Sequence, residues 1–188
     1  MHPGSATLVF ALNVLLVAAC APASPEVELA ASEIPEGWTT VTSGRADLQV
    51  ALPPWLKAFD RSTGIFANEV IEGGGQGLEL MAEGPRTAEP QPGGTALQDW
   101  LAARIVSPVA GPPVVSGTTL PAGRAVVIDR LDTDGTRYQW RIRAYAIETA
   151  FGTMSLVIDG PPDAWAGRED DIAQIAQRLR AGPGRPAP

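Results

Sequence analysis

The stretch that decides the fold is residues 124–147, RAVVIDRLDTDGTRYQWRIRAYAI, which has the pattern of a β-hairpin. In its second arm two sets of side chains alternate, namely Tyr138, Trp140, Ile142, Ala144 and Ala146 with Arg137, Gln139, Arg141, Arg143 and Tyr145. Alternation with a period of two predicts a strand that has one face in the core and the other in water.

The turn of this hairpin sets which residues lie opposite one another. Asp132–Gly135 suits a three-residue loop in which Gly135 is left-handed. That register places four apolar residues side by side on the core face: Val126, Ile128, Trp140 and Ile142. A slip by one residue would turn all of them to the other face.

Further strands and two helices are predicted on either side of the hairpin. With the hairpin included, the expected strands are residues 38–42, 46–52, 65–71, 78–82, 114–120, 124–131, 136–147 and 151–158. A short helical turn is expected at 55–59. One helix begins at Thr95 and a terminal helix is capped by Asp163. Their apolar faces are Leu97, Trp100, Leu101 and Ile105, and Ile172, Ile175, Ala176 and Leu179.

This order of elements predicts the fold class α+β. We expect a mostly antiparallel curved sheet of about eight strands, with the two main helices packed on one of its faces.

The N-terminal region predicts an export signal. Residues 6–19 are almost wholly apolar but too few to span a bilayer as a mature helix. They end in Val17-Ala18-Ala19-Cys20, which resembles the lipobox of bacterial lipoproteins. The resemblance implies a signal peptide over 1–19, lipid on Cys20 and a place on the extracytoplasmic face of the cell membrane. Since residues 1–5 contain no Lys or Arg, an ordinary cleaved signal or a buried N-terminal helix stays open.

The rest of the chain divides into a tether, one domain and a tail. Residues 20–34, rich in Ala, Ser, Pro and Glu, predict a disordered tether after the lipidated cysteine. Residues 35–181 predict one folded domain, and residues 182–188 a disordered tail.

Composition argues against several functions. The chain has 14 basic and 21 acidic residues, a net charge of −7, which disfavours a nucleic-acid partner. Cys20 is its one cysteine, and its one histidine, His2, lies in the predicted signal peptide. Ser-His and Cys-His catalysis and histidine metal sites are therefore not expected in the mature chain. We predict no catalytic residue, no metal site and no cofactor.

Four patterns resemble sites but are better explained by structure. Asp132–Gly135 lacks the Glu of a calcium loop, and the glycine run 73–77 lacks the Lys of a phosphate cradle. The acids 169–171 suit the N-terminus of a helix, and Lys57 has no serine partner at a motif spacing.

The stripe Arg137, Arg141 and Arg143 is the candidate binding surface. Guanidinium groups on one strand face suit an anionic partner, such as lipid headgroups, an anionic cell-surface polymer or an acidic envelope protein. The alternative is a solvated sheet face whose arginines pair with acids such as Asp129.

The order of several short segments resembles PsbP-like domains, a superfamily named after the extrinsic PsbP subunit of photosystem II. The segments are Leu52-Pro53-Pro54-Trp55, the mid-chain helix with Trp100, Leu120-Pro121-Ala122-Gly123-Arg124, the Asp134-Gly135 hairpin, Phe151–Leu156 and the terminal helix. The resemblance implies a curved antiparallel sheet flanked by helices, with a role in binding or assembly. It carries no active-site signature, so no functional residue follows from it.

The function predicted is therefore a lipid-anchored, non-catalytic binding or assembly-accessory domain. One alternative is a carrier that holds a small apolar ligand or lipid between sheet and helices, in a cavity lined by Trp and Ile. A further alternative is a hydrolase whose chemistry uses two facing carboxylates.

Overall fold

A computed structural model of the protein describes residues 29–43, 47–61, 64–86, 95–105, 107, 109–135, 137 and 139–182. The predicted signal peptide, Cys20, the first part of the predicted tether and the tail beyond Gly182 lie outside these residues. Of the helices that the described ranges contain, none is long and apolar enough to cross a membrane.

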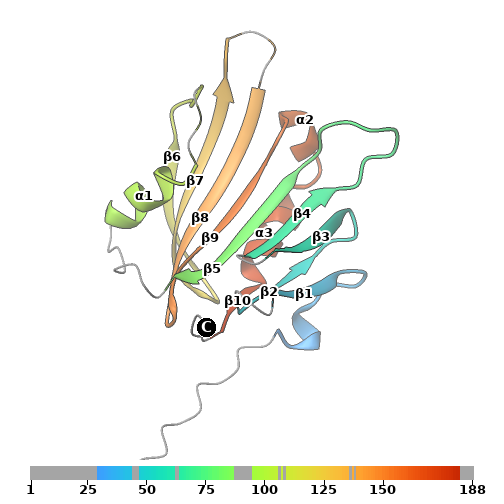
Figure 1. Ribbon diagram of the computed structural model, residues 1–188, viewed down its shortest axis with the longest axis vertical. Coiled ribbons are helices and arrows are strands. Elements are labelled where there is room, and N and C mark those ends of the chain that lie inside the picture. The colour runs from blue at the N-terminus through green and yellow to red at the C-terminus, as the bar shows by residue number, and fades with distance from the viewer. Residues whose placement is uncertain are drawn as a thin grey trace, which may run out of the picture.

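Ten strands in the described part of the chain form two antiparallel sheets (Figure 1). The larger sheet has the order β3-β4-β5-β9-β8-β7-β6. Its strands are β3 (Leu56–Arg61), β4 (Gly64–Glu69), β5 (Glu79–Arg86), β6 (Val114–Leu120), β7 (Gly123–Thr133), β8 (Gln139–Thr149) and β9 (Gly152–Gly160). The smaller sheet has the order β1-β2-β10, with β1 (Thr39–Ser43), β2 (Leu48–Leu52) and β10 (Leu179–Ala181). The α+β class is confirmed, with more strands than the sequence predicts.

The hairpin that decides the fold is β7–β8, and its connection is longer than predicted. β7 runs to Thr133 and β8 begins at Gln139, so the three-residue loop is wrong. Ile128 lies opposite Ala144 and not beside Trp140. The shift is an even number of residues, so the face predicted for each side chain is correct. Gly135 has a φ of 78°, the left-handed conformation that the sequence predicts.

The first face of the larger sheet, here called the α1 face, is covered by α1 (Thr95–Ala102). Leu97 and Leu101 of this helix are fully buried against the sheet. The core on this side also includes Ile105, Ile128, Ile142, Ala144, Ala146 and Val157. The predicted apolar faces of the helix and of the hairpin therefore meet here.

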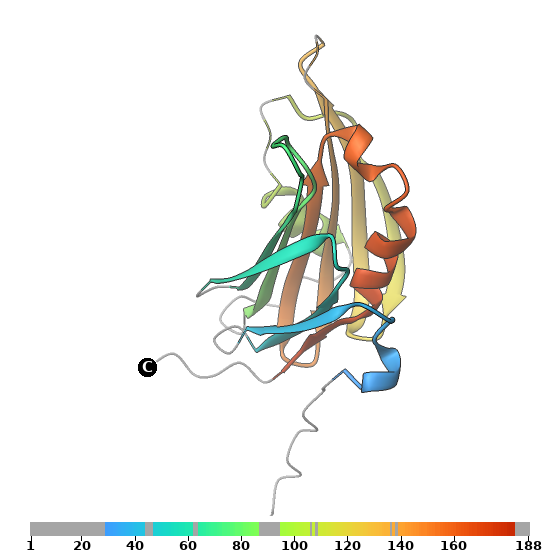
Figure 2. The same cartoon turned by 90° about the vertical axis from the view of Figure 1, so that its right-hand side faces the viewer.

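The second face, here called the α3 face, is covered by α2 (Pro162–Trp165), α3 (Glu169–Gln177) and the smaller sheet (Figure 2). Trp165, Ile172 and Ile175 are buried in the same core as Tyr145 and Ile147 of β8. The prediction that both helices cover one face is therefore wrong. The reason is that the side of β8 that carries the arginines also carries Tyr145 and Ile147 further along the strand. These two side chains need cover, and α3 provides it.

Three local predictions also change. Residues 55–59 lie mostly in β3, because buried Leu56 and exposed Lys57 begin the alternation of a strand. Asp163 makes no cap, since it lies inside α2, and α3 begins only at Glu169. Leu179 does not belong to the helix: it opens β10, which pairs with β2.

The N-terminal segment from Leu29 to Glu33, inside the predicted tether, packs on the folded domain. Leu29 is 8% exposed, and its amide donates to the Gln49 side chain at 2.6 Å. Ala31–Glu33 form a 3₁₀ turn. Glu33 forms an ion pair with Arg180 of β10 at 2.7 Å, so the two ends of the described chain are joined.

Candidate functional site

The three arginines predicted to bind a partner do not lie in one environment. Arg137 is exposed, in the connection between β7 and β8. Arg141 and Arg143 lie on the α3 face of β8, where α2 and α3 partly cover them. The structure therefore separates Arg137 from the other two.

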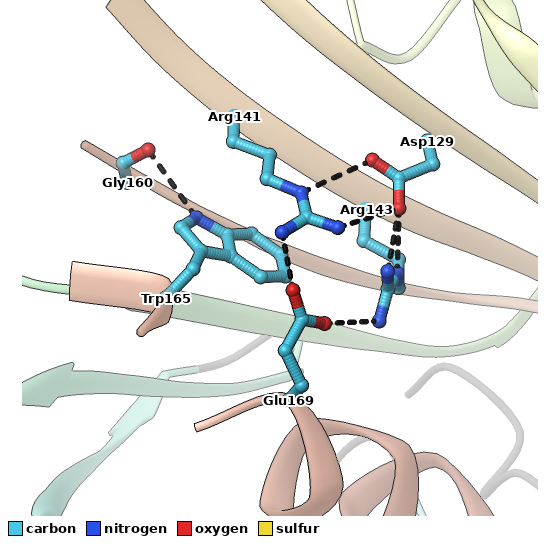
Figure 3. A network of polar contacts seen from close by, with 6 residues as sticks. All are labelled: Asp129, Arg141, Arg143, Gly160, Trp165 and Glu169. Carbon is cyan, nitrogen blue, oxygen red and sulfur yellow. Dashed lines mark hydrogen bonds and ion pairs between the residues drawn. The ribbon is translucent and has the colours of Figure 1, made fainter. Parts of the chain in front are cut away.

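Arg141 and Arg143 form a network with two carboxylates (Figure 3). Asp129 of β7 accepts from Arg141 Nε at 3.3 Å and from Arg143 Nε at 3.0 Å. Glu169, the first residue of α3, accepts from Arg143 at 3.1 Å and also from Arg141. We call these four residues the ionic cluster. Pairing with Asp129 is the alternative that the sequence offered for the stripe, and the structure contains it.

The indole of Trp165 supports the ionic cluster from the helix side. The Arg141 guanidinium carbon lies 4.5 Å from the centre of the ring, within cation–π range. The Trp165 side chain is 1% exposed, and its N–H donates to the carbonyl of Gly160 at 3.4 Å. Stacking and ion pairs together fasten the start of α3 to the sheet.

The ionic cluster is electrically balanced, with two guanidinium groups and two carboxylates. Burial acts to raise the pKa of Asp129, but hydrogen bonds from Arg141 and Arg143 outweigh it and hold the pKa below its ordinary value. Asp129 is therefore ionised at neutral pH. An anionic partner at Arg141 and Arg143 would compete with groups already bound.

A groove of about 350 Å³ lies beside the ionic cluster on the α3 face. It runs between α3 and the outer strands, and we call it the α3–β6 groove. Its lining residues are Val114, Ser116, Thr118, Leu120, Val127, Asp129, Arg143, Tyr145, Ala173, Ala176 and Gln177. Its charged residues, Asp129 and Arg143, form an ion pair at 2.6 Å, so the lining has no net charge.

Short side chains leave this groove open. Three residues of α3 line the groove, namely Ala173, Ala176 and Gln177. The methyl side chains of the two alanines are too short to reach the outer strand. On β6 the hydroxyl residues Ser116 and Thr118 are exposed. The floor therefore offers both apolar surface and hydroxyl groups, which suits an uncharged, partly apolar segment of a partner.

Two carboxylates do lie side by side, but on the other face of the sheet. Asp159 of β9 is opposite Glu79 of β5, on the α1 face with Ile142. Burial raises the pKa of Asp159 to about 6, a hydrogen bond from the Trp140 indole opposes the rise, and Glu79 adds to it. These acids do not line the α3–β6 groove. Elsewhere in the described ranges, no three His, Cys, Asp or Glu side chains come together in a way that could hold a metal ion.

Sequence reasoning missed Glu169, Trp165 and the groove. The acids that open α3 were visible in the sequence, but only as helix-terminus residues. Glu169 is separated from Arg141 by 28 positions, and no local pattern predicts that contact. The groove depends on how far α3 reaches over the sheet, which is a tertiary property.

Comparison with known proteins places the fold. No protein-family model matches the chain, and no curated protein is detectably similar in sequence. The Ran-binding protein Mog1p of Saccharomyces cerevisiae superposes with a TM-score of 0.55 at 9% identity, over 77% of this chain and 95% of that one. Cyanobacterial PsbP (CyanoP) from Synechocystis sp. PCC 6803 does so with a TM-score of 0.55 at 7% identity, over 83% and 99%.

At these identities the likeness shows the fold alone. The chain has a PsbP-like α+β fold, as the order of its sequence segments predicts.

Proposed function

We propose that this protein is a lipid-anchored accessory domain on the extracytoplasmic face of the cell membrane, which acts by binding a partner protein and not by catalysis. The observation that carries the proposal is the α3–β6 groove, which is open, without net charge and about 350 Å³ in volume. The lipobox-like run ending at Cys20 supports the anchor, and the folded domain follows it closely in the chain.

The chemistry of the groove favours binding over catalysis. Its carboxylate, Asp129, is held by Arg141 and Arg143, so it is not available as a general base. Tyr145 is 6% exposed, and burial raises its pKa above the ordinary value, so it stays protonated at neutral pH. The lining offers a surface to recognise and no group poised to react.

A carrier of a small apolar ligand receives less support. Ligand pockets range from about 300 to about 1,000 Å³ and enclose most of the ligand. The groove is at the small end of this range, and its lining contains no Trp or Ile. On this face Trp165 and Ile172 are buried in the packed core, and Trp38 and Trp55 are partly buried against it.

The anchor is tested by mass spectrometry of the mature protein from native membranes. We expect an N-terminal cysteine at position 20 that carries acyl chains, and a Cys20→Ala variant that leaves the membrane fraction. An unacylated, soluble wild-type protein would overturn the anchor without touching the groove.

The groove is tested by photo-cross-linking in living cells. A photoreactive amino acid at Ser116 lies in the groove, whereas one at exposed Glu72, in the glycine turn between β4 and β5, is the matched control. We expect one discrete adduct between position 116 and a different protein, which the control does not give. The same adducts from both positions, or none from position 116, would contradict the proposal.

A further inference from the structure

The outer strand β6 has an open hydrogen-bonding edge. It pairs with β7 on one side, and no other strand of the described chain pairs with its outer side. Six of its seven residues are exposed. The outward N–H and C=O groups of such a strand are free to pair with another strand.

The composition of β6 differs from that of a protected edge. Its sequence, VVSGTTL, contains no charge and no proline, and Val114 is 70% exposed. Natural edge strands commonly carry Lys or Pro to prevent pairing. The opposite edge of the same sheet follows that rule, since β3 carries exposed Lys57. The contrast indicates that the outer edge of β6 pairs with a strand of another chain.

From this edge we infer that two copies of the chain associate by antiparallel pairing of β6 with β6, about a two-fold axis at Gly117. The strand is self-complementary in that register. Gly117 meets Gly117, Ser116 meets Thr118, Val115 meets Thr119 and Val114 meets Leu120 of the second copy. Every pair is small, hydroxylated or apolar, and no like charges meet. The interface is isologous, because both copies use the same strand, as in most homodimers.

This pairing would make one continuous sheet of two seven-stranded sheets. The axis is perpendicular to the sheet, so the α3 faces of both copies lie on the same side. The two α3–β6 grooves would then adjoin, because Ser116 and Thr118 of each copy form part of the floor. The inference does not rest on the proposed partner protein, since the edge is open whether or not the groove is filled.

A cysteine scan of the full chain in native membranes tests the register. A Cβ added at Gly117 meets no atom within 4 Å, so Gly117→Cys fits the fold. Opposed residues of an antiparallel pair have Cα atoms about 4.5–5.5 Å apart, within the range of about 4.4–6.8 Å that a disulfide spans. We expect mild oxidation to give a covalent dimer of Gly117→Cys. The wild type, oxidised in the same way, is the control for a disulfide formed through Cys20.

Thr119→Cys is the matched control. In the proposed register Thr119 of one copy is opposite Val115 of the other. The two Thr119 residues are therefore about 13 Å apart along the strand. We expect no dimer from Thr119→Cys alone or Val115→Cys alone, and a dimer when the two variants are co-expressed. Three results would overturn the inference. They are the absence of a dimer from Gly117→Cys, equal amounts of dimer from all three single-cysteine variants, and a link from position 117 to a different protein.

A second measurement does not depend on cysteine chemistry. Thr119→Lys places a charge on the exposed edge, opposite apolar Val115 of the second copy. We expect sedimentation of the detergent-solubilised wild type to show a dimer, and Thr119→Lys to shift it to monomer with an unchanged circular dichroism spectrum. A wild type that stays monomeric at all concentrations would overturn the inference.

Discussion

Asp159 is a carboxylate whose environment makes a quantitative prediction. It lies on β9 opposite Glu79, and it accepts a hydrogen bond from the Trp140 indole. Burial is the main cause that raises its pKa from 3.8 to about 6. The folded protein therefore holds a proton that the unfolded chain releases between these two values.

The sign of the pH dependence follows from this difference. Where the folded state binds more protons, the free energy of unfolding falls as the pH rises. The contribution of Asp159 is therefore full below pH 3.8 and lost as the pH passes about 6. Since one pKa unit is 1.36 kcal/mol, the whole loss is at most about 3 kcal/mol.

The perturbation that removes this loss is Asp159→Asn, which cannot ionise but keeps an oxygen to accept from Trp140. We expect the variant to be more stable than the wild type near neutral pH, by up to about 3 kcal/mol, and equal to it in acid. Urea unfolding followed by tryptophan fluorescence, repeated at several pH values, measures the difference. Comparing the two proteins at each pH cancels the titration of other groups, such as Asp129.

Two results would refute the reasoning. If Asp159→Asn were less stable than the wild type near neutral pH, the charge would be stabilising and not a cost. If the difference between the two proteins did not change with pH, the carboxylate would have the same pKa folded and unfolded.

Three further substitutions test the packing around the site, each by urea unfolding near neutral pH. Asp129→Asn removes the charge that Arg141 and Arg143 share and should cost about 1–3 kcal/mol; because its pKa is lowered, the cost should shrink in acid, and a constant cost would contradict the pairing. Trp165→Ala empties the space under the ionic cluster and should cost about 3–5 kcal/mol; a loss well below this would mean that α2 is loosely packed. Gly123→Ala puts a Cβ 1.8 Å from the Glu148 carbonyl oxygen at a φ of 152° and should destabilise the fold strongly. Gly117→Ala is the control, because its Cβ meets nothing within 4 Å. Equal stability of the two variants would show that β7 and β8 approach each other less closely.

The sequence predicted the strands well because their information is local. Alternation from Trp140 to Ala146 assigned each β8 residue to its face, and an even register shift left those faces unchanged. The periodicity of a strand does not show which element covers each of its faces. Tyr145 is buried beneath α3, which begins 24 positions further along the chain, and no residue near Tyr145 in the sequence indicates that contact.

The candidate site was predictable to the same extent. Pairing of the arginine stripe with Asp129 was an alternative that the sequence offered, but the position of Asp129 directly opposite Arg143 was not predicted, because the predicted register of the hairpin was different. Glu169 and Trp165 reach the arginines only because α2 and α3 fold back over the sheet. The groove depends on the absence of bulk at Ala173 and Ala176, and an alanine in a sequence does not reveal what it fails to touch.

The contact between the ends of the described chain sets a path for mechanical force. A pull on the segment before Leu29 would first load the Leu29–Gln49 hydrogen bond and the Glu33–Arg180 ion pair. The tension would then pass into β1, which among the described strands is paired only with β2 and can separate from it one residue pair at a time. β2 would stay joined to β10, so β1 could peel from β2 before α3 or the seven-stranded sheet lost a hydrogen bond. A domain tethered by its N-terminus could in this way stretch at its base while its groove kept its shape.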